Sequence, residues 1–232
     1  MSLQVRKVVE RARAEPEGRF HSLAHLLDVP ALEAAYRSVR KDAAVGVDGV
    51  TKDQYGQDLE RNLQDLHERL RSKRYRHQPI RRVHIPKDGG RTRPIGISAL
   101  EDKVVQGAVR HVLEAIYEQD FLDCSFGFRP GRNPHGAIRA LDRAVHRGEV
   151  SWILEADIVS LGFDSLDRTK LKELLQIRVA DGSLLRLIGK LWRVGVLDGE
   201  AYTTPDRGTA QGSGITPRTQ KVTSMVGAVI GR

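Results

Sequence analysis

The chain has 232 residues, of which 40% are hydrophobic and 29% charged, so it can bury a sizeable core as one large domain or two small ones. No apolar run approaches the length of a membrane span and the charged N-terminus lacks a secretory signal, which predicts a cytoplasmic protein without a membrane role. The net charge of +8 favours an acidic partner, and the single cysteine, Cys124, excludes an internal disulfide and is predicted to be a small buried hydrophobe.

The first half of the chain is predicted to be helical up to a β-hairpin. Residues 1–40 favour helix, and a turn is expected at residues 46–49. Thr51 and Gln54 have the spacing of a capping box, which predicts a helix that continues to about Leu70. Apolar residues then alternate with polar ones over residues 80–97, on both sides of a turn at residues 88–90. This pattern predicts a basic hairpin.

The second half mixes helices with a predicted strand. Ser98 and Glu101 suggest a second capping box, ahead of apolar residues at helical spacing. Asn133 and Pro134 are a typical start for a further helix. Residues 150–158 alternate as in a strand, and helices are predicted around residues 171–176 and 184–192. Because helices and strands are interleaved and hairpins are expected, the predicted fold class is α+β.

Positive charge is concentrated in one segment. Residues 69–93 hold ten Lys or Arg and one acid, Asp88, for a local charge of +9. Such a density favours a polyphosphate partner, because each neutralised phosphate releases condensed counterions. The alternative is a solvated basic face. We predict contacts with nucleic acid from Arg74, Arg76, Arg81 and Arg82.

Seven short motifs occur along the chain in an order and spacing that chance does not explain. Together they resemble the reverse transcriptases encoded by bacterial group II introns. The resemblance implies a fingers and palm fold and RNA-directed DNA polymerase activity. The motifs occupy residues 46–51, 74–76, 85–87, 93–97, 125–132, 155–158 and 208–213.

The resemblance also implies roles for individual residues. An aspartate at a strand end suits a Mg²⁺ ligand, although such a residue is more often a cap or an edge charge. The implied cofactor is Mg²⁺, two ions in the intact family, and the implied partners are an RNA template or intron RNA, a DNA primer and deoxynucleoside triphosphates. The implied site residues are Asp157 and the carbonyl of Ile158 for metal, with Asp157 catalytic; Lys87, Arg93, Gln211 and Gly212 for the nucleotide; and Arg129 for template or primer.

The same resemblance divides the chain into four regions. They are an N-terminal helical extension (1–40), a fingers region with the basic hairpin (41–149), a partial palm (150–217) and an unrelated tail (218–232). The match stops before the family's Tyr-Ala-Asp-Asp strand, and residues 207–232 contain no acid. Asp164 also follows Asp157 by one residue more than in the family, with Gly162 in the place of an aromatic residue. We therefore expect an incomplete polymerase that is inactive as this fragment, or alternatively a non-catalytic, maturase-like RNA-binding module.

Overall fold

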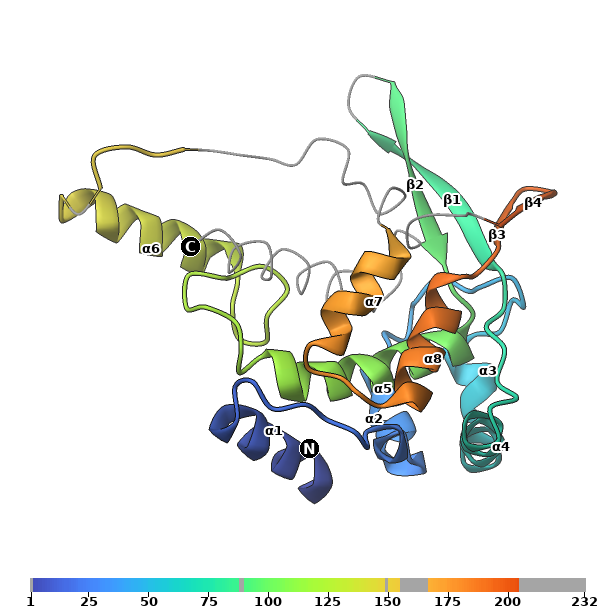
Figure 1. Ribbon diagram of the computed structural model, residues 1–232. Coiled ribbons are helices and arrows are strands. Elements are labelled where there is room, and N and C mark those ends of the chain that lie inside the picture. The colour runs from blue at the N-terminus through green and yellow to red at the C-terminus, as the bar shows by residue number, and fades with distance from the viewer. Residues whose placement is uncertain (1, 88–89, 149, 155–166, 205–232) are drawn as a thin grey trace.

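The computed structural model describes residues 2–87, 90–148, 150–154 and 167–204 (Figure 1). Pairs of strands follow runs of helices along the described chain, as the α+β prediction requires. The helices are α1 (Leu3–Ala14), η1 (Ala24–Leu26), α2 (Val29–Ser38), α3 (Lys52–Gly56), α4 (Leu59–Arg71), α5 (Leu100–Tyr117), α6 (Pro134–His146), α7 (Arg168–Gln176) and α8 (Gly182–Trp192). The strands are β1 (Ile80–Lys87), β2 (Arg91–Ile97), β3 (Val196–Asp198) and β4 (Ala201–Thr203).

Helix α5 runs through the centre of the hydrophobic core. Its residues Val105, Val109, Val112 and Ile116 recur at helical spacing and are all buried. Helices α1 and α2 pack against α5, so the N-terminal helices share one core with the rest of the described chain (Figure 1). Full burial of one aliphatic side chain contributes about 1.5–3 kcal/mol, which makes α5 the main anchor of the fold. Helix α6, in contrast, has no buried residue and projects from the body.

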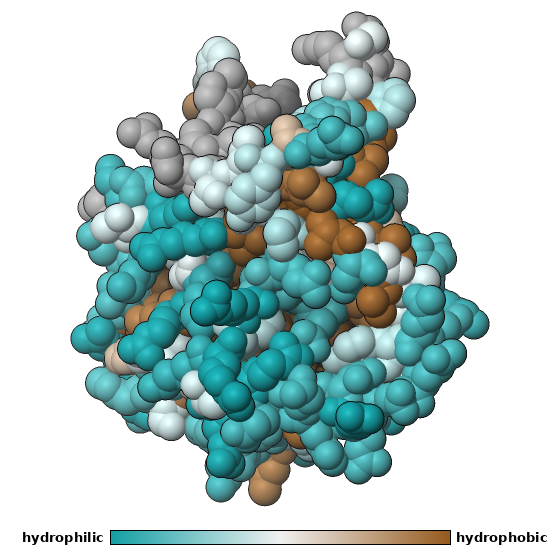
Figure 2. Space-filling model, turned by 90° about the vertical axis from the view of Figure 1, so that its right-hand side faces the viewer, coloured by the Kyte–Doolittle hydropathy of each residue, from teal (hydrophilic) through white to brown (hydrophobic). Residues whose placement is uncertain are grey.

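The sheet has the strand order β2-β1-β3-β4. Strands β1 and β2 pair antiparallel from Arg81 opposite Ile97 to Lys87 opposite Arg91. Strand β3 runs parallel to β1 and pairs only with Ile80 and Arg81, so most of the hairpin extends beyond the rest of the sheet (Figure 1). The predicted hairpin is confirmed. On this side of the molecule, hydrophilic side chains cover most of the surface, with a smaller apolar area next to the hairpin (Figure 2).

The helix predicted after Thr51 forms as two helices. The capping box is confirmed, because the Thr51 hydroxyl accepts from Gln54 N at 3.2 Å and the Gln54 side chain accepts from Thr51 N at 2.9 Å. Helix α3 ends at Gly56, where the Tyr36 hydroxyl lies so close that a side chain would clash. The chain bends there before α4 begins at Leu59, because tertiary packing overrides the continuous apolar pattern.

The second predicted capping box is wrong. The N-cap of α5 is Ala99, without a side-chain cap, and the Ser98 hydroxyl instead accepts from the Gln106 amide at 3.1 Å. The Glu101 carboxylate accepts two hydrogen bonds from the Arg69 guanidinium, at 2.6 and 3.0 Å. A bidentate, charge-assisted pair is stronger than a bond to a backbone N–H, so Glu101 turns toward α4.

Two further expectations fail in the described residues. Of the strand predicted over residues 150–158, residues 150–154 form no strand, and Trp152 and Leu154 are 93% and 91% exposed. Extended backbone becomes a strand only when a neighbour accepts its hydrogen bonds, and these five residues have no such neighbour in the described chain. Residues 155–158 lie outside the described ranges. Cys124 is exposed rather than buried, because it lies in the loop that follows α5.

Within the described ranges, none of the helices combines the length and the apolar composition that a membrane crossing requires. The cytoplasmic location stays a prediction. So does the division into residues 1–40, 41–149, 150–217 and 218–232.

Candidate nucleic-acid interface

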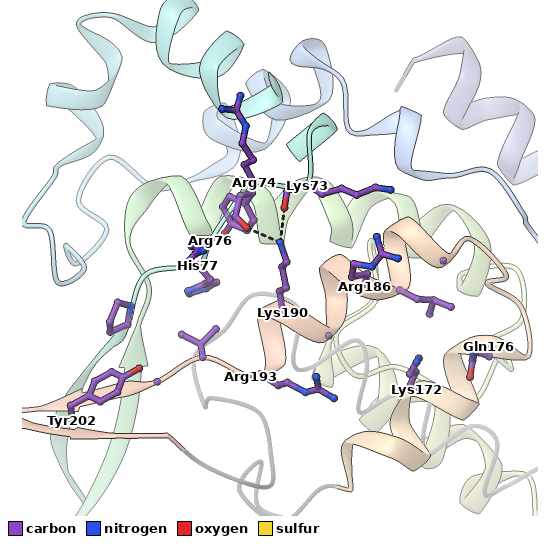
Figure 3. Close-up of a pocket in the computed structure, with 17 residues that line it drawn as sticks. Lys73, Arg74, Arg76, His77, Lys172, Gln176, Arg186, Lys190, Arg193 and Tyr202 are labelled. Carbon is purple, nitrogen blue, oxygen red and sulfur yellow. Dashed lines mark hydrogen bonds between the residues drawn. The ribbon is translucent and has the colours of Figure 1, made fainter. Parts of the chain in front are cut away.

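A groove of about 1160 Å³ opens between residues 73–79 and helices α7 and α8 (Figure 3). Its described lining contains no Asp or Glu, and none of its cations forms an ion pair with a carboxylate of the described residues. A surface of this kind concentrates positive potential where a polyanion can enter. The cations are Lys73, Arg74, Arg76, Lys172, Arg186, Lys190 and Arg193.

Helix α8 supplies one wall of the groove. Arg186, Lys190 and the C-cap residue Arg193 follow at spacings of four and three residues, which places them on one side of the helix. The opposite face is apolar and buried, with Leu184, Ile188 and Leu191 in the core. The amphipathic sequence of α8 therefore fixes its orientation and turns Arg186, Lys190 and Arg193 toward the groove.

The segment that follows α4 supplies the other wall. The Lys190 ammonium donates to the carbonyl of Lys73 at 3.0 Å and to that of Tyr75 at 2.9 Å, which ties α8 to this segment (Figure 3). Lys73 has a φ of 62°, in the left-handed region that usually holds glycine after a helix. A side chain there costs about 1–2 kcal/mol, so the groove wall contains a locally strained lysine.

A buried polar cluster of Tyr75, His77, Asp102 and Gln106 fixes the same segment against α5. The Tyr75 hydroxyl donates to Asp102 Oδ1 at 2.5 Å, and Gln78 N donates to Oδ2 at 3.1 Å. His77 Nδ1 lies 3.3 Å from Asp102 Oδ2, and its Nε2 lies 3.0 Å from the amide nitrogen of Gln106. An amide nitrogen can only donate, so Nε2 is the accepting nitrogen and Nδ1 carries the proton. The cluster fixes the backbone of the groove wall on α5.

Burial dominates the ionisation of this cluster. It raises the pKa of Asp102 to about 7, although the Tyr75 hydroxyl and the Gln78 amide both favour the carboxylate. Burial also lowers the pKa of His77 to about 4. Near neutral pH the imidazole is therefore uncharged, and its role in the described structure is to position the chain.

The projecting hairpin carries the cations predicted for a nucleotide. Arg93 is exposed on β2, opposite Ile85 of β1. The backbone of Lys87 pairs with Arg91 at the outer end of the hairpin, while the Lys87 side chain lies outside the described part. The two residues thus lie on opposite strands of one hairpin. Their contact with a triphosphate stays a prediction.

Comparison with known proteins places the chain among intron-encoded proteins. No family model matches it. Protein YkfC of Escherichia coli (strain K12) is 36% identical over 221 residues, which are 91% of this chain and 57% of that protein. The group II intron-encoded protein LtrA of Lactococcus lactis subsp. cremoris is 33% identical over 184 residues, 79% of this chain and 30% of LtrA. The chain is a homologue of group II intron-encoded proteins. It spans little more than half of YkfC and less than a third of LtrA.

Solved structures agree on the fold. A partial Cas6-RT-Cas1–Cas2 complex matches 85% of this chain and 32% of the compared chain, with a TM-score of 0.54 and 19% sequence identity. The predicted reverse-transcriptase fold class is confirmed for this homologue of group II intron-encoded proteins. The match stands for the fold alone, because the identity is low.

The four arginines that were predicted to contact nucleic acid lie in different surroundings. Arg74 and Arg76 line the groove. The Arg81 guanidinium donates twice to the carbonyl of Val45, at 3.1 and 2.7 Å, and this holds the loop before α3. Arg82 lies 3.7 Å from the carboxylate of Asp198. Of these four residues, the two in the groove are the better placed for a polyanion.

The Arg129 side chain binds partners within the protein. It donates to the Glu118 carboxylate at 2.7 Å and to the carbonyls of Leu122 and Ser125 at 2.8 and 3.1 Å. Its side chain is only 7% exposed and lies over the Phe121 ring. Arg129 thus shapes the loop after α5, and its contact with template or primer stays a prediction.

The residues predicted for catalysis lie outside the described ranges. This applies to Asp157 and Ile158, to the spacing irregularity around Gly162, and to Gln211 and Gly212. The residues that the structure describes contain no group of three or more His, Cys, Asp or Glu that could hold a metal ion. The Mg²⁺ ligands and the nucleotide pocket stay predictions.

Sequence reasoning missed the groove cations of α7 and α8. Lys172, Arg186, Lys190 and Arg193 are spread over 22 positions among apolar residues, so they form no charged run. The signal that could have indicated them is the helical spacing of Arg186, Lys190 and Arg193 opposite the apolar face of α8. Tertiary packing brings these cations into one groove with Arg74 and Arg76.

Proposed function

We propose that this chain supplies the fingers and the first part of the palm of an RNA-directed DNA polymerase of the group II intron type. Its partners would be an RNA template or intron RNA, a DNA primer and deoxynucleoside triphosphates. The observation that carries the proposal is a basic groove beside the projecting hairpin, with no Asp or Glu among its described lining residues, in a homologue of LtrA. A groove of this kind suits the phosphates of a nucleic acid, because charge neutralisation dominates affinity for such ligands.

The proposed roles follow the chemistry of each residue. The groove cations neutralise template phosphates, and Lys87 and Arg93 hold the triphosphate from the two strands of the hairpin. Gln211 and Gly212 shape the nucleotide pocket, where glycine permits a close approach of the backbone. Asp157 and the carbonyl of Ile158 would hold Mg²⁺, which supplies Lewis-acid stabilisation for phosphoryl transfer.

Primer extension on an RNA template tests the polymerase proposal. We compare residues 1–232 alone with a chimera that adds a homologous palm strand with Tyr-Ala-Asp-Asp and a thumb, each with and without Asp157→Ala. We expect extension from the chimera only, and its loss in Asp157→Ala. An extension-competent Asp157→Ala chimera would refute the assigned role of Asp157. A folded chimera without any extension would refute the polymerase proposal.

A second candidate is a non-catalytic, maturase-like RNA-binding module, which the groove supports without any catalytic residue. The test is RNA binding against salt concentration, with Arg74, Arg76, Arg186 and Arg193 replaced together by Ala. The slope of log affinity against log salt should fall by about 0.7 for each lost contact with single-stranded phosphate. The matched control replaces four exposed arginines outside the groove, Arg6, Arg19, Arg61 and Arg139, and should leave the slope nearly unchanged. Equal slopes in both variants would contradict the groove as the RNA site.

A further inference from the structure

A second, smaller cavity adjoins the basic groove. It has a volume of about 350 Å³ and lies between η1, the end of α4 and α8. Lys73, Tyr75, Arg186 and Lys190 line both cavities, so the two spaces share one wall. The smaller cavity therefore lies directly beside the groove.

The lining of the smaller cavity differs from that of the groove. Leu27, Leu70 and Leu187 supply apolar surface, and His25 and His67 contribute imidazole rings. As in the groove, the described lining residues include no Asp or Glu. The occupant suited to this lining has an apolar face with polar edges and is attached to a negatively charged chain.

Several contacts hold this cavity in shape. Asp181 accepts from Leu23 N and Ala24 N at 2.6 and 2.8 Å, and also caps α8 through Ser183 N and Leu184 N. One carboxylate thus joins the chain before η1 to the start of α8. Burial raises the pKa of Asp181, but the four backbone donors outweigh it and the net pKa lies below its ordinary value. Together with the Lys190 bonds to the opposite wall, this junction keeps the cavity formed without a ligand.

We propose that the groove and the cavity together bind single-stranded RNA, with phosphates along the groove and one unpaired base in the cavity. The inference rests on the proposed RNA-binding function and makes its substrate more specific. A nucleobase presents an apolar face and polar edges, and imidazole rings both stack on bases and hydrogen-bond with them. Basic grooves that alternate with stacking surfaces are the usual means of holding single strands. A base inside a duplex is stacked and paired, so it cannot enter a side cavity without leaving the helix.

The test measures affinity for three fluorescent probes of equal charge. They are an oligouridylate of on the order of ten nucleotides, the same ribose-phosphate chain without bases, and an RNA duplex. The variants are His25→Ala with His67→Ala, and Leu187→Trp, which fills the cavity from α8. The matched control is His135→Ala with His146→Ala on the exposed helix α6.

We expect both cavity variants to bind the oligouridylate about 5- to 100-fold more weakly, the effect of losing one stacked base. Their salt slope should stay unchanged, because no phosphate contact is lost. Binding of the base-free chain and the duplex should not change, and the control should match the native protein. Equal effects on the oligouridylate and the base-free chain, or no effect on either, would overturn the base-binding cavity. If the groove variant with Arg74, Arg76, Arg186 and Arg193 replaced by Ala also keeps full affinity, the RNA-binding proposal itself fails.

Discussion

The basic groove and the loop after α5 both contain arginines from motifs that predict nucleic-acid binding, yet they use them differently. In the groove, Arg74 and Arg76 face no carboxylate of the described chain. In the loop, Arg129 is bound by Glu118, while Arg132 pairs with Asp123 at 2.9 Å and lies over the Phe126 ring. A sequence motif identifies the cations, but the neighbouring carboxylates and carbonyls in the fold determine which of them remain available to a ligand.

The difference has a physical cause. A guanidinium that is buried with a carboxylate has already lost its water, and breaking that pair leaves an unpaired charge in the interior. An exposed arginine that forms no ion pair is still hydrated, so a phosphate can bind it without breaking a contact within the protein. Binding then gains from counterion release without disrupting the fold. Exposure and partners therefore separate arginines that support structure from those that bind ligand.

The largest expected effect comes from Arg129→Ala. This change removes the ion pair with Glu118, whose side chain is 22% exposed, and the hydrogen bonds to the carbonyls of Leu122 and Ser125. We expect a loss of about 2–3 kcal/mol in the free energy of unfolding, measured by urea titration. Arg193→Ala in the groove should cost less than about 0.5 kcal/mol.

RNA binding by the same two variants completes the comparison. Arg193→Ala should reduce the salt slope, while Arg129→Ala should leave the slope of the folded protein unchanged. The opposite pattern, with Arg129 setting the slope and Arg193 the stability, would break the distinction between the two regions.

The buried cluster under the groove gives an intermediate effect that depends on pH. The raised pKa of Asp102 stabilises the folded state most at low pH, and this contribution is lost as pH rises from about 4 through about 7. The lowered pKa of His77 acts in the other direction, because the unfolded chain takes up the extra proton between pH 6.5 and about 4. In the native protein the two contributions largely cancel over this window.

Single substitutions should expose the two contributions. With Asp102→Asn, the free energy of unfolding should increase as the pH is raised from 4 to 6.5. With His77→Asn, it should decrease as the pH is raised from 4 to 7. Each change should amount to about 1–3 kcal/mol, since one pKa unit corresponds to about 1.4 kcal/mol. Urea titrations at several pH values measure this, with His135→Asn on α6 as the control. Parallel pH profiles for both variants would contradict the opposed titration.

Local sequence predicted the elements whose determinants are local. The hairpin follows from alternation around a turn, and Asn133 caps α6 by accepting from Gly136 N at 2.8 Å, as its sequence indicates. Asp167 likewise caps α7, through Thr169 N and Lys170 N. Each of these signals acts within a few residues, so the sequence alone contains it.

Elements that depend on distant partners were not predictable in this way. Strands β3 and β4 are three residues each and exist because Ile80 and Arg81 of β1 offer an edge. Glu101 has the spacing of a capping residue in the sequence, but in the structure it accepts a hydrogen bond from Arg69 of α4. The candidate site divides in the same manner, because Arg74 and Arg76 are neighbours in sequence, whereas Arg186 and Arg193 join them only through the packing of α8.

The smallest expected effect comes from Lys73→Gly, and it has opposite signs for stability and binding. Lys73 has a φ of 62°, which glycine adopts without strain, so the substitution should raise the free energy of unfolding by up to about 1 kcal/mol. The carbonyl that accepts from Lys190 is kept, because it belongs to the backbone. The groove loses one cation, and the salt slope of RNA binding should fall by about 0.7.

Lys73→Ala is the matched control for this prediction. It removes the same charge but keeps a Cβ in the left-handed region, so it should weaken RNA binding equally without the gain in stability. Thermal unfolding and RNA titration of the three proteins measure both quantities. A Lys73→Gly protein that is no more stable than Lys73→Ala would show that the backbone at this position carries no strain. Full RNA affinity in both variants would place Lys73 among the structural cations and move the boundary of the groove to Arg74.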